Sequence, residues 1–411
     1  MAVRVYLKQA WNLMKQNPLF STLYIVGTGI SIVMTMVIAI VYYVRLAPVY
    51  PETNRMRTLV VKSAKMTNDE STHSANISYA MLKDWFYSLE SAEVSTGVSG
   101  TSYARVTNDK EEIPTYARYT DENFFRVFPL VFLEGKPFTE ADRRSGIHNV
   151  VLTDSYAQQL FGTTKGVVGK NFLMDYTNVK VVGVVKSGSF LTPDSYAQVY
   201  LPYSCRDGYD DEGSHWALGG YRVYILMKES KSVTDVQDEV LELVRKFNVS
   251  DMGDGWKLDL VGQPELYWHS TFRLWSNVAV DWGRVIWMFV GIFMVLLFVP
   301  AFNLSGMISA RMERQLPDLG IRKAFGASRR RLLVQIIWEN LLLTGLGTLL
   351  GLVIAWIVLA LSGYEIFSLF EVFPKFPPKG VNLGMGIDMF FAPLILSLIH
   401  ISEPTRRTPI S

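Results

Sequence analysis

Three long apolar runs divide the chain, and a shorter run lies near its end. We predict residues 19–44, 285–308 and 332–361 as transmembrane helices, because at about 1.5 Å per residue each can cross a hydrocarbon core of about 30 Å. A cleaved signal peptide is the alternative for 19–44, but the run is longer than the apolar part of a signal. The short run, 387–399, is interrupted by proline and predicts a partial, truncated fourth transmembrane helix.

The distribution of Lys and Arg predicts the orientation of these helices. Residues 1–18 carry three basic residues and no acid, and their apolar positions recur at helical spacing, which predicts an amphipathic helix on the membrane surface. Residues 309–331 are strongly basic, whereas 362–386 carry only two lysines. Because basic segments stay on the cytosolic side, 1–18 and 309–331 are predicted to be cytosolic, 362–386 to be an outer loop, and 45–284 to be extracytoplasmic.

The segment 45–284 alternates short β-type runs with helical ones, which predicts a large α+β domain inserted between the first two transmembrane helices. Helical spacing of apolar residues predicts helices at Tyr79–Leu89 and Ser232–Phe247. The strand candidates are Arg57–Lys62, Thr115–Tyr119, Val150–Thr153, Val179–Val185, Tyr221–Met227 and Trp256–Val261.

Composition and motifs exclude several classes of function. The 411 residues are 49% hydrophobic and carry a formal net charge of +2, which gives no support for nucleic-acid binding. Cys205 is the only cysteine, so the domain has no internal disulfide. No histidines pair at ligand spacing, and no catalytic or phosphate-loop motif is present, so we predict no catalytic, cofactor or metal site in this chain.

The cytosolic segment contains a short helix with its own start and stop signals. Pro317 suits the first helical turn, and Asp318 places a negative charge where the helix dipole favours it. Arg322 and Lys323 put positive charge near the other end, and Gly326 is suited to the left-handed conformation that closes a helix.

Leu319, Ile321 and Phe325 give this short helix an apolar side. A basic loop that only anchors the membrane helices is the alternative, but an anchor needs charge and not a capped helix. Ser328 can cap the helix that follows, which begins with three arginines at the membrane interface, Arg329, Arg330 and Arg331. Glu339 can pair with Arg330 or Arg331 near the inner surface, or it can face a partner helix.

Two separate stretches resemble one family of membrane proteins. DLGIRKAFGASRRR, residues 318–331, resembles the cytosolic coupling segment of FtsX-like and MacB-like ABC transporter permeases, although Asp318 stands where Glu is usual. In the outer region, NFFRVFPLVFLEGKPFTEAD and VVLTDSYAQQLFG resemble the MacB-like periplasmic core domain in order and spacing, and Gly135 corresponds to the glycine of a family turn.

The resemblance implies the membrane subunit of a MacB/FtsX-type ABC transporter in the bacterial inner membrane, with a periplasmic core domain. A separate ABC ATPase would hold ATP and Mg and would bind the short helix. The transmembrane helices would pass the motion of this helix to the periplasmic domain. The transported compound would be a peptide, an antibiotic or a similar molecule, moved by export or efflux. Further implied partners are a second copy or a paralogous permease, membrane lipid, a periplasmic adaptor and an outer-membrane channel.

Three alternatives remain open from the sequence. A LolC/LolE-like lipoprotein transporter or an FtsX-like regulator of a cell-wall hydrolase would use the same coupling, and a membrane-anchored sensor would need no ATPase. Residues 400–411 resemble translated sequencing-adapter read-through, so we expect the native fourth transmembrane helix to continue differently.

Overall fold

The computed structural model describes most of the chain and divides it into two compact units. The described residues are 11, 14–15, 18–100, 102–107, 112–189, 192–210, 216–250, 255–296, 298, 317, 320–321, 323–326 and 328–368. Among them, unit 1 contains the residues up to 43 and those from 283 onward, and unit 2 contains residues 44–282. The predicted partial helix 387–399 and the tail 400–411 lie outside the described residues, as does most of 1–18.

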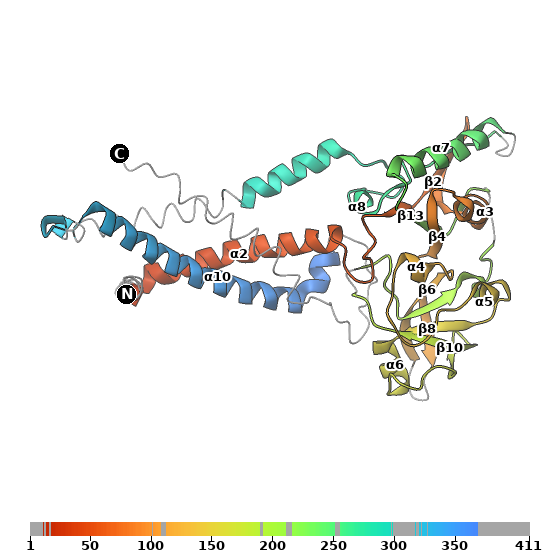
Figure 1. The fold of residues 1–411 in the computed structure, drawn as a ribbon, viewed down its shortest axis with the longest axis horizontal. Coiled ribbons are helices and arrows are strands. Elements are labelled where there is room, and N and C mark those ends of the chain that lie inside the picture. The colour runs from red at the N-terminus through yellow and green to blue at the C-terminus, as the bar shows by residue number, and fades with distance from the viewer. Residues whose placement is uncertain are drawn as a thin grey trace. The chain divides into compact units, whose positions relative to one another are not determined.

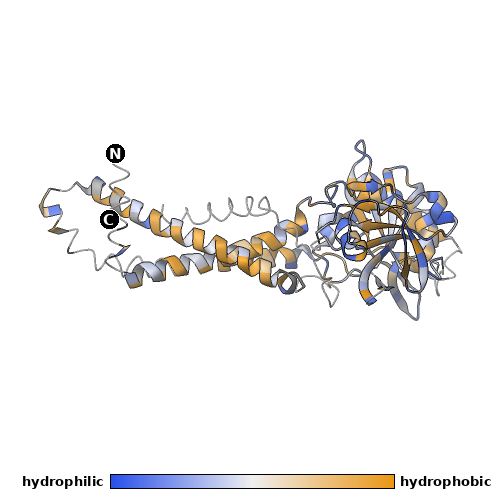
Figure 2. Cartoon of the chain, turned by 90° about the horizontal axis from the view of Figure 1, so that it is seen from below, coloured by the Kyte–Doolittle hydropathy of each residue, from blue (hydrophilic) through white to orange (hydrophobic). Residues whose placement is uncertain are grey.

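Unit 1 is built from helices. Two described helices are long and apolar enough to cross a membrane, namely Ser21–Leu46 within α2 (Pro18–Leu46) and Leu332–Ser362 within α10 (Arg329–Ser368), whereas the apolar helix Trp282–Leu296 is shorter. Figure 2 shows apolar residues along most of the two long helices. The part of the predicted second transmembrane helix at 299–308 lies outside the described residues.

Helix α10 continues beyond the predicted end at residue 361. Residues 362–368 are helical, although we predicted an outer loop there. The segment contains one glycine and no proline, and a single glycine costs only about 1 kcal/mol, which does not stop a helix that is already formed.

Close packing between α2 and α10 depends on glycines. Gly347 and Gly351 of α10 face α2, and a Cβ added at Gly351 would lie 2.7 Å from the carbonyl oxygen of Gly29. The hydroxyls of Tyr24 and Thr344 are 3.1 Å apart across the same contact. Small residues four apart let two membrane helices approach until their backbones touch.

Unit 2 has the predicted α+β class and contains two sheets (Figure 1). The first sheet has the order β14-β2-β3-β13-β1-β15, with β12 on β3 and β4 on β13. Its strands are β1 (Thr58–Val61), β2 (Ala64–Thr67), β3 (Thr72–Ile77), β4 (Ala92–Ser99), β12 (Leu218–Gly219), β13 (Tyr221–Met227), β14 (Lys257–Asp259) and β15 (Glu265–Leu266).

The second sheet has the order β7-β10-β8-β11-β6-β5-β9, and β9 also pairs with β10. Six of its strands therefore form a closed ring, and β7 pairs only with β10, beyond the residues of β10 that pair with β9. The strands are β5 (Ser102–Thr107), β6 (Glu112–Thr120), β7 (Phe132–Gly135), β8 (Asn149–Thr153), β9 (Asn171–Met174), β10 (Thr177–Val185) and β11 (Val199–Pro202).

Helices cover both sheets and create three apolar clusters. Helices α3 (Tyr79–Asp84) and α7 (Val233–Val249) pack on the first sheet, and α6 (Asp154–Phe161) packs on the second (Figure 1). A third cluster joins strands of both sheets to α4 (Phe124–Val127) and α8 (Tyr267–Ser270). The other short helices are α5 (Glu140–Arg144), η1 (Phe86–Ser88) and η2 (Tyr203–Cys205).

The helix predicted at Tyr79–Leu89 is interrupted. Helix α3 ends at Asp84, and the 3₁₀ helix η1 follows. The hydroxyl of Ser88 donates to the carbonyls of Asp84 and Trp85, each over 2.9 Å. Serine side chains compete in this way for helical carbonyls and shorten helices.

Candidate functional site

The short helix before α10 ends where its sequence predicts. The amide of Phe325 donates to the carbonyl of Ile321 over 3.1 Å, which is a helical hydrogen bond. Gly326 has a φ of 86°, the left-handed conformation that favours glycine, and its amide donates to the carbonyl of Lys323 over 3.0 Å. Helix α10 begins at Arg329, so four residues separate it from Ala324, the last helical residue before the turn.

The apolar side chains of this helix are exposed. Phe325 is 89% exposed and Ile321 is 56% exposed, and Lys323 next to them is also exposed. An exposed aromatic residue with charged neighbours has the composition of a binding surface with an apolar centre and a polar rim.

The structure describes only part of the predicted coupling site. Pro317 is helical and exposed, whereas Asp318, Leu319 and Arg322 lie outside the described residues. Arg329, Arg330 and Arg331 open α10, and Arg330 is exposed. The side chains of Arg329, Arg331 and Glu339 are not described, so the pairing of Glu339 with an arginine stays a prediction.

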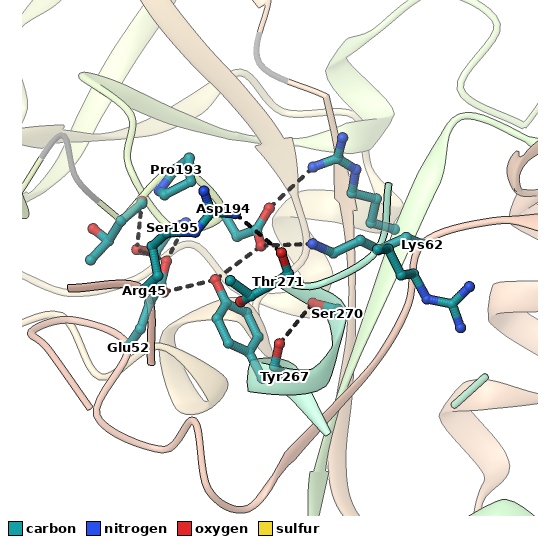
Figure 3. Close-up of polar contacts among 12 residues, drawn as sticks. Arg45, Glu52, Lys62, Pro193, Asp194, Ser195, Tyr267, Ser270 and Thr271 are labelled. Atoms are coloured by element: carbon teal, nitrogen blue, oxygen red, sulfur yellow. Dashed lines mark hydrogen bonds and ion pairs between the residues drawn. The ribbon is translucent and has the colours of Figure 1, made fainter. Parts of the chain in front are cut away.

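A second candidate site, which the sequence analysis did not identify, is a buried polar network in unit 2 (Figure 3). We call Glu52, Arg55, Asp194, Ser195 and Tyr267 the buried junction, and none of these residues is more than 5% exposed. A buried charge is costly unless it is paired and hydrogen-bonded, so each contact in this network affects stability.

Arg55 joins the end of α2 to Glu52. Its Nη1 donates to the carbonyls of Val44 over 2.5 Å and Ala47 over 2.7 Å, which lie at the carboxyl end of α2. Its Nε and Nη2 donate to Oε2 of Glu52 over 2.9 Å and 2.6 Å. A guanidinium at a helix carboxyl end satisfies carbonyls that lack helical partners and has the charge that the dipole favours.

Glu52 divides its two oxygens between two other segments. Oε1 accepts from the amide of Ser195 over 3.1 Å and from its hydroxyl over 2.8 Å. Oε2, besides Arg55, accepts from the phenol of Tyr267 over 2.7 Å. Ser195 lies in the loop between β10 and β11 of the second sheet, and Tyr267 opens α8 directly after β15 of the first.

Asp194 is the second carboxylate of the junction. Its Oδ2 accepts from the phenol of Tyr267 over 2.9 Å, and it pairs with Arg222 over 3.1 Å and Lys62 over 3.7 Å. Burial alone would raise the pKa of Asp194, but Lys62 and Arg222 outweigh burial and hold it below its usual range. Burial and the two carboxylates raise the pKa of Tyr267, so it remains a protonated donor.

Two more arginines hold the same segments. Arg45, in the last turn of α2, donates to the carbonyl of Thr271, directly after α8, over 3.2 Å (Figure 3). Arg118 on β6 donates to the carbonyls of Pro193 over 2.7 Å and Tyr196 over 3.0 Å. The junction therefore connects the end of α2, the loop 192–198 and the segment that enters the helix Trp282–Leu296.

The contacts of the junction connect several segments of the fold. Among the residues that the structure describes, no group of three His, Cys, Asp or Glu side chains could hold a metal ion. The anionic side chains of the junction are each paired with cations, so they resist separation of the segments that carry them.

Comparison with known families covers both units. The model of the MacB-like periplasmic core domain matches residues 20–243, and the model of the FtsX-like permease C-terminal region matches residues 277–406. Two solved structures are similar at a low level, each covering 48% of this chain. The first is the periplasmic region of MacB from Actinobacillus actinomycetemcomitans, with 16% identity, a TM-score of 0.35 and coverage of 88% of that chain. The second is the extracellular domain of the noncanonic ABC-type transporter YknZ from Gram-positive bacteria, with 16% identity, a TM-score of 0.34 and coverage of 99% of that chain.

Curated relatives are ATP-binding/permease proteins. The macrolide export protein MacB of Escherichia coli O157:H7 is 22% identical over 64% of this chain, and the pyoverdine export protein PvdT of Pseudomonas fluorescens is 24% identical over 71%. The chain covers 39% and 41% of the length of these two relatives. Because the core-domain model alone matches more than half of the chain, the protein belongs to the FtsX-like permeases that carry a MacB-like periplasmic core domain.

Proposed function

We propose that this chain is the membrane subunit of a MacB/FtsX-type ABC transporter that functions in export or efflux. The ABC ATPase is a partner subunit, and this chain passes the ATP-driven motion of that ATPase to its own periplasmic unit. The observation that carries the proposal is the short helix that ends at Gly326 and exposes Phe325, in a chain with both family regions. The export function is supported by the names of the relatives, MacB and PvdT.

The connections within unit 1 supply a path for this motion. ATP binding would draw the ATPase subunits together and displace the short helix bound to them. Because α10 begins at Arg329, a displacement of the short helix moves the start of α10. Helix α10 packs on α2 through Gly347 and Gly351, so the two helices move together. Helix α2 ends at Leu46, and the carbonyl of Val44 in its last turn accepts from Nη1 of Arg55.

The proposal includes a topology that labelling can test. In a Cys205→Ser background, a membrane-impermeant maleimide added to intact spheroplasts is expected to label Ser145→Cys, because Ser145 is an exposed residue of the periplasmic unit. The same reagent should label Gln315→Cys only after the membrane is permeabilised. Labelling of Gln315→Cys in intact spheroplasts would reverse the proposed orientation.

Binding of the ATPase is expected to depend on Phe325. Truncating an interface anchor of this type costs about 2 kcal/mol, so Phe325→Ala should weaken the ATPase complex about thirtyfold in detergent. Lys323→Ala, a change at the rim, should weaken it less, with an effect that decreases at high salt. Gly326→Val should also weaken binding, because a β-branched residue resists the left-handed conformation.

The measurement is titration of the tagged, full-length chain with its ABC ATPase, and hydrolysis of ATP is followed in parallel. Insertion into the membrane serves as the control for folding. Full ATPase affinity in all three variants would mean that the segment is only a basic membrane anchor, and the proposed coupling would be wrong.

A further inference from the structure

We propose that Tyr267 is a positioning residue for force transmission. Its single phenolic proton is shared between Glu52 and Asp194. Glu52 is bound through Arg55 to the end of α2, and Asp194 belongs to the loop 192–198. The inference rests on the proposed function and specifies where motion enters the periplasmic unit. Tyr267 would hold the helix end and the two sheets together in one arrangement and allow a second arrangement when α2 moves.

The end of α2 is linked to Glu52 and cannot move without it. Arg55 donates through Nη1 to two carbonyls at the end of α2 and through Nε and Nη2 to Glu52, so one planar guanidinium binds both. A bidentate contact of this kind fixes orientation as well as distance. A displacement of the helix end therefore displaces the carboxylate of Glu52.

Glu52 and Asp194 are paired with different basic residues. Glu52 follows α2 through Arg55. Asp194 is paired with Arg222 on β13 and Lys62 after β1, and the neighbouring carbonyls of Pro193 and Tyr196 are held by Arg118. Different basic residues thus hold the two carboxylates in place, and Ser195 links the loop to Glu52 directly.

The phenol oxygen of Tyr267 lies 2.7 Å from Oε2 of Glu52 and 2.9 Å from Oδ2 of Asp194 (Figure 3). A phenol has one proton and can donate one well-aligned hydrogen bond at a time. Each carboxylate is also compensated by cations, so neither acceptor is excluded. The phenol can therefore donate either to Glu52 or to Asp194, and a small shift of Glu52 would select between these two hydrogen bonds. A two-state element of this kind amplifies sub-ångström motion.

The test uses the full chain with its ABC ATPase, with and without Mg-ATP, and follows hydrogen exchange by mass spectrometry. In the wild type, nucleotide should change the exchange rate of the loop 192–198 about fivefold or more, the lower range of allosteric coupling. In Tyr267→Phe the change should fall below about twofold in that loop, because Phe keeps the ring and removes only the shared donor.

The matched control is Tyr156→Phe. Tyr156 on α6 is also buried, and its hydroxyl lies 2.5 Å from that of Thr115 on β6. This variant should lose a similar amount of stability but keep the nucleotide response, which separates transmission from folding.

The outcomes distinguish the inference from the function on which it rests. A nucleotide response of equal size in the wild type and Tyr267→Phe overturns the role of Tyr267 and leaves the proposed function standing. The absence of any nucleotide response in wild-type unit 2, with the ATPase bound, overturns the proposed function itself. Equal loss of response in Tyr156→Phe would show that the effect is only destabilisation.

Discussion

Replacing Arg55 with methionine is expected to lower the free energy of unfolding of the periplasmic unit by about 3–5 kcal/mol, because removing one partner of a buried ion pair leaves the other charge uncompensated. Arg55 is 3% exposed and Glu52 is 1% exposed. Methionine has similar length and fills the space, so little of the loss would come from a cavity. The carbonyls of Val44 and Ala47 would lose their donors at the same time.

The measurement is urea unfolding of the full chain in detergent, followed by tryptophan fluorescence. Arg245→Met is the matched control, because the pair Arg245–Glu242 is exposed on α7 and exposed ion pairs contribute little to stability. Adding Glu52→Gln to Arg55→Met should recover part of the loss, since the buried negative charge is then gone. A loss for Arg55→Met no larger than that of the control would contradict the importance of this pair.

Substituting Gly351 with leucine is expected to separate α2 from α10. A Cβ at this position would lie 2.7 Å from the carbonyl oxygen of Gly29 and 2.7 Å from Cβ of Ile32, and backbone cannot yield as a side chain does. Overpacking of a close contact costs about 1–3 kcal/mol, so association of the two helices should weaken by about tenfold or more.

Cross-linking of Tyr24→Cys to Thr344→Cys with a short bifunctional maleimide reports this contact, because the native hydroxyls of these residues are 3.1 Å apart. In a Cys205→Ser background, Gly351→Leu should lower the cross-linking yield sharply. Gly345→Leu is the control on the same helix, since a Cβ there meets nothing within 4 Å. If the yield is the same in both variants, the close approach of the helices is not needed for their packing.

The sequence predicts those parts of the fold that are encoded by local pattern. Long uncharged runs predict α2 and the body of α10, and β-branched runs predict β1, β6, β8, β10 and β13. The conformation of Gly326 is predicted as well, because a charged helix followed by Gly-Ala-Ser is a local signal.

Other strands escape prediction because their sequences are polar. Strand β4 has the sequence AEVSTGVS, in which only Ala92, Val94 and Val98, at alternate positions, are apolar, yet all but one of its residues are buried. Its polar side chains are satisfied by contacts with distant residues, such as the bond of 2.7 Å from the hydroxyl of Thr96 to Asp121. Such partners cannot be identified from a local pattern.

The buried junction is unpredictable for the same reason. Glu52 and Arg55 read as ordinary charges in a loop after a membrane helix, and Asp194 and Tyr267 are separated from them by most of the domain. Only the folded domain brings these residues together, through the bonds of Arg55 to the end of α2 and of Tyr267 to the two carboxylates. The one local signal is a carboxylate three residues before an arginine, directly after an apolar helix, and surface pairs of this spacing are common.

The closed ring in the second sheet bears on how this unit avoids aggregation. Unpaired strand edges are templates for association with other chains. Because β9 pairs with both β5 and β10, β7 is the one described strand of that sheet that pairs with a single neighbour, and it spans only Phe132–Gly135. Val131 and Leu133 are about half exposed there, so the shortness of β7 is what limits self-association at this edge.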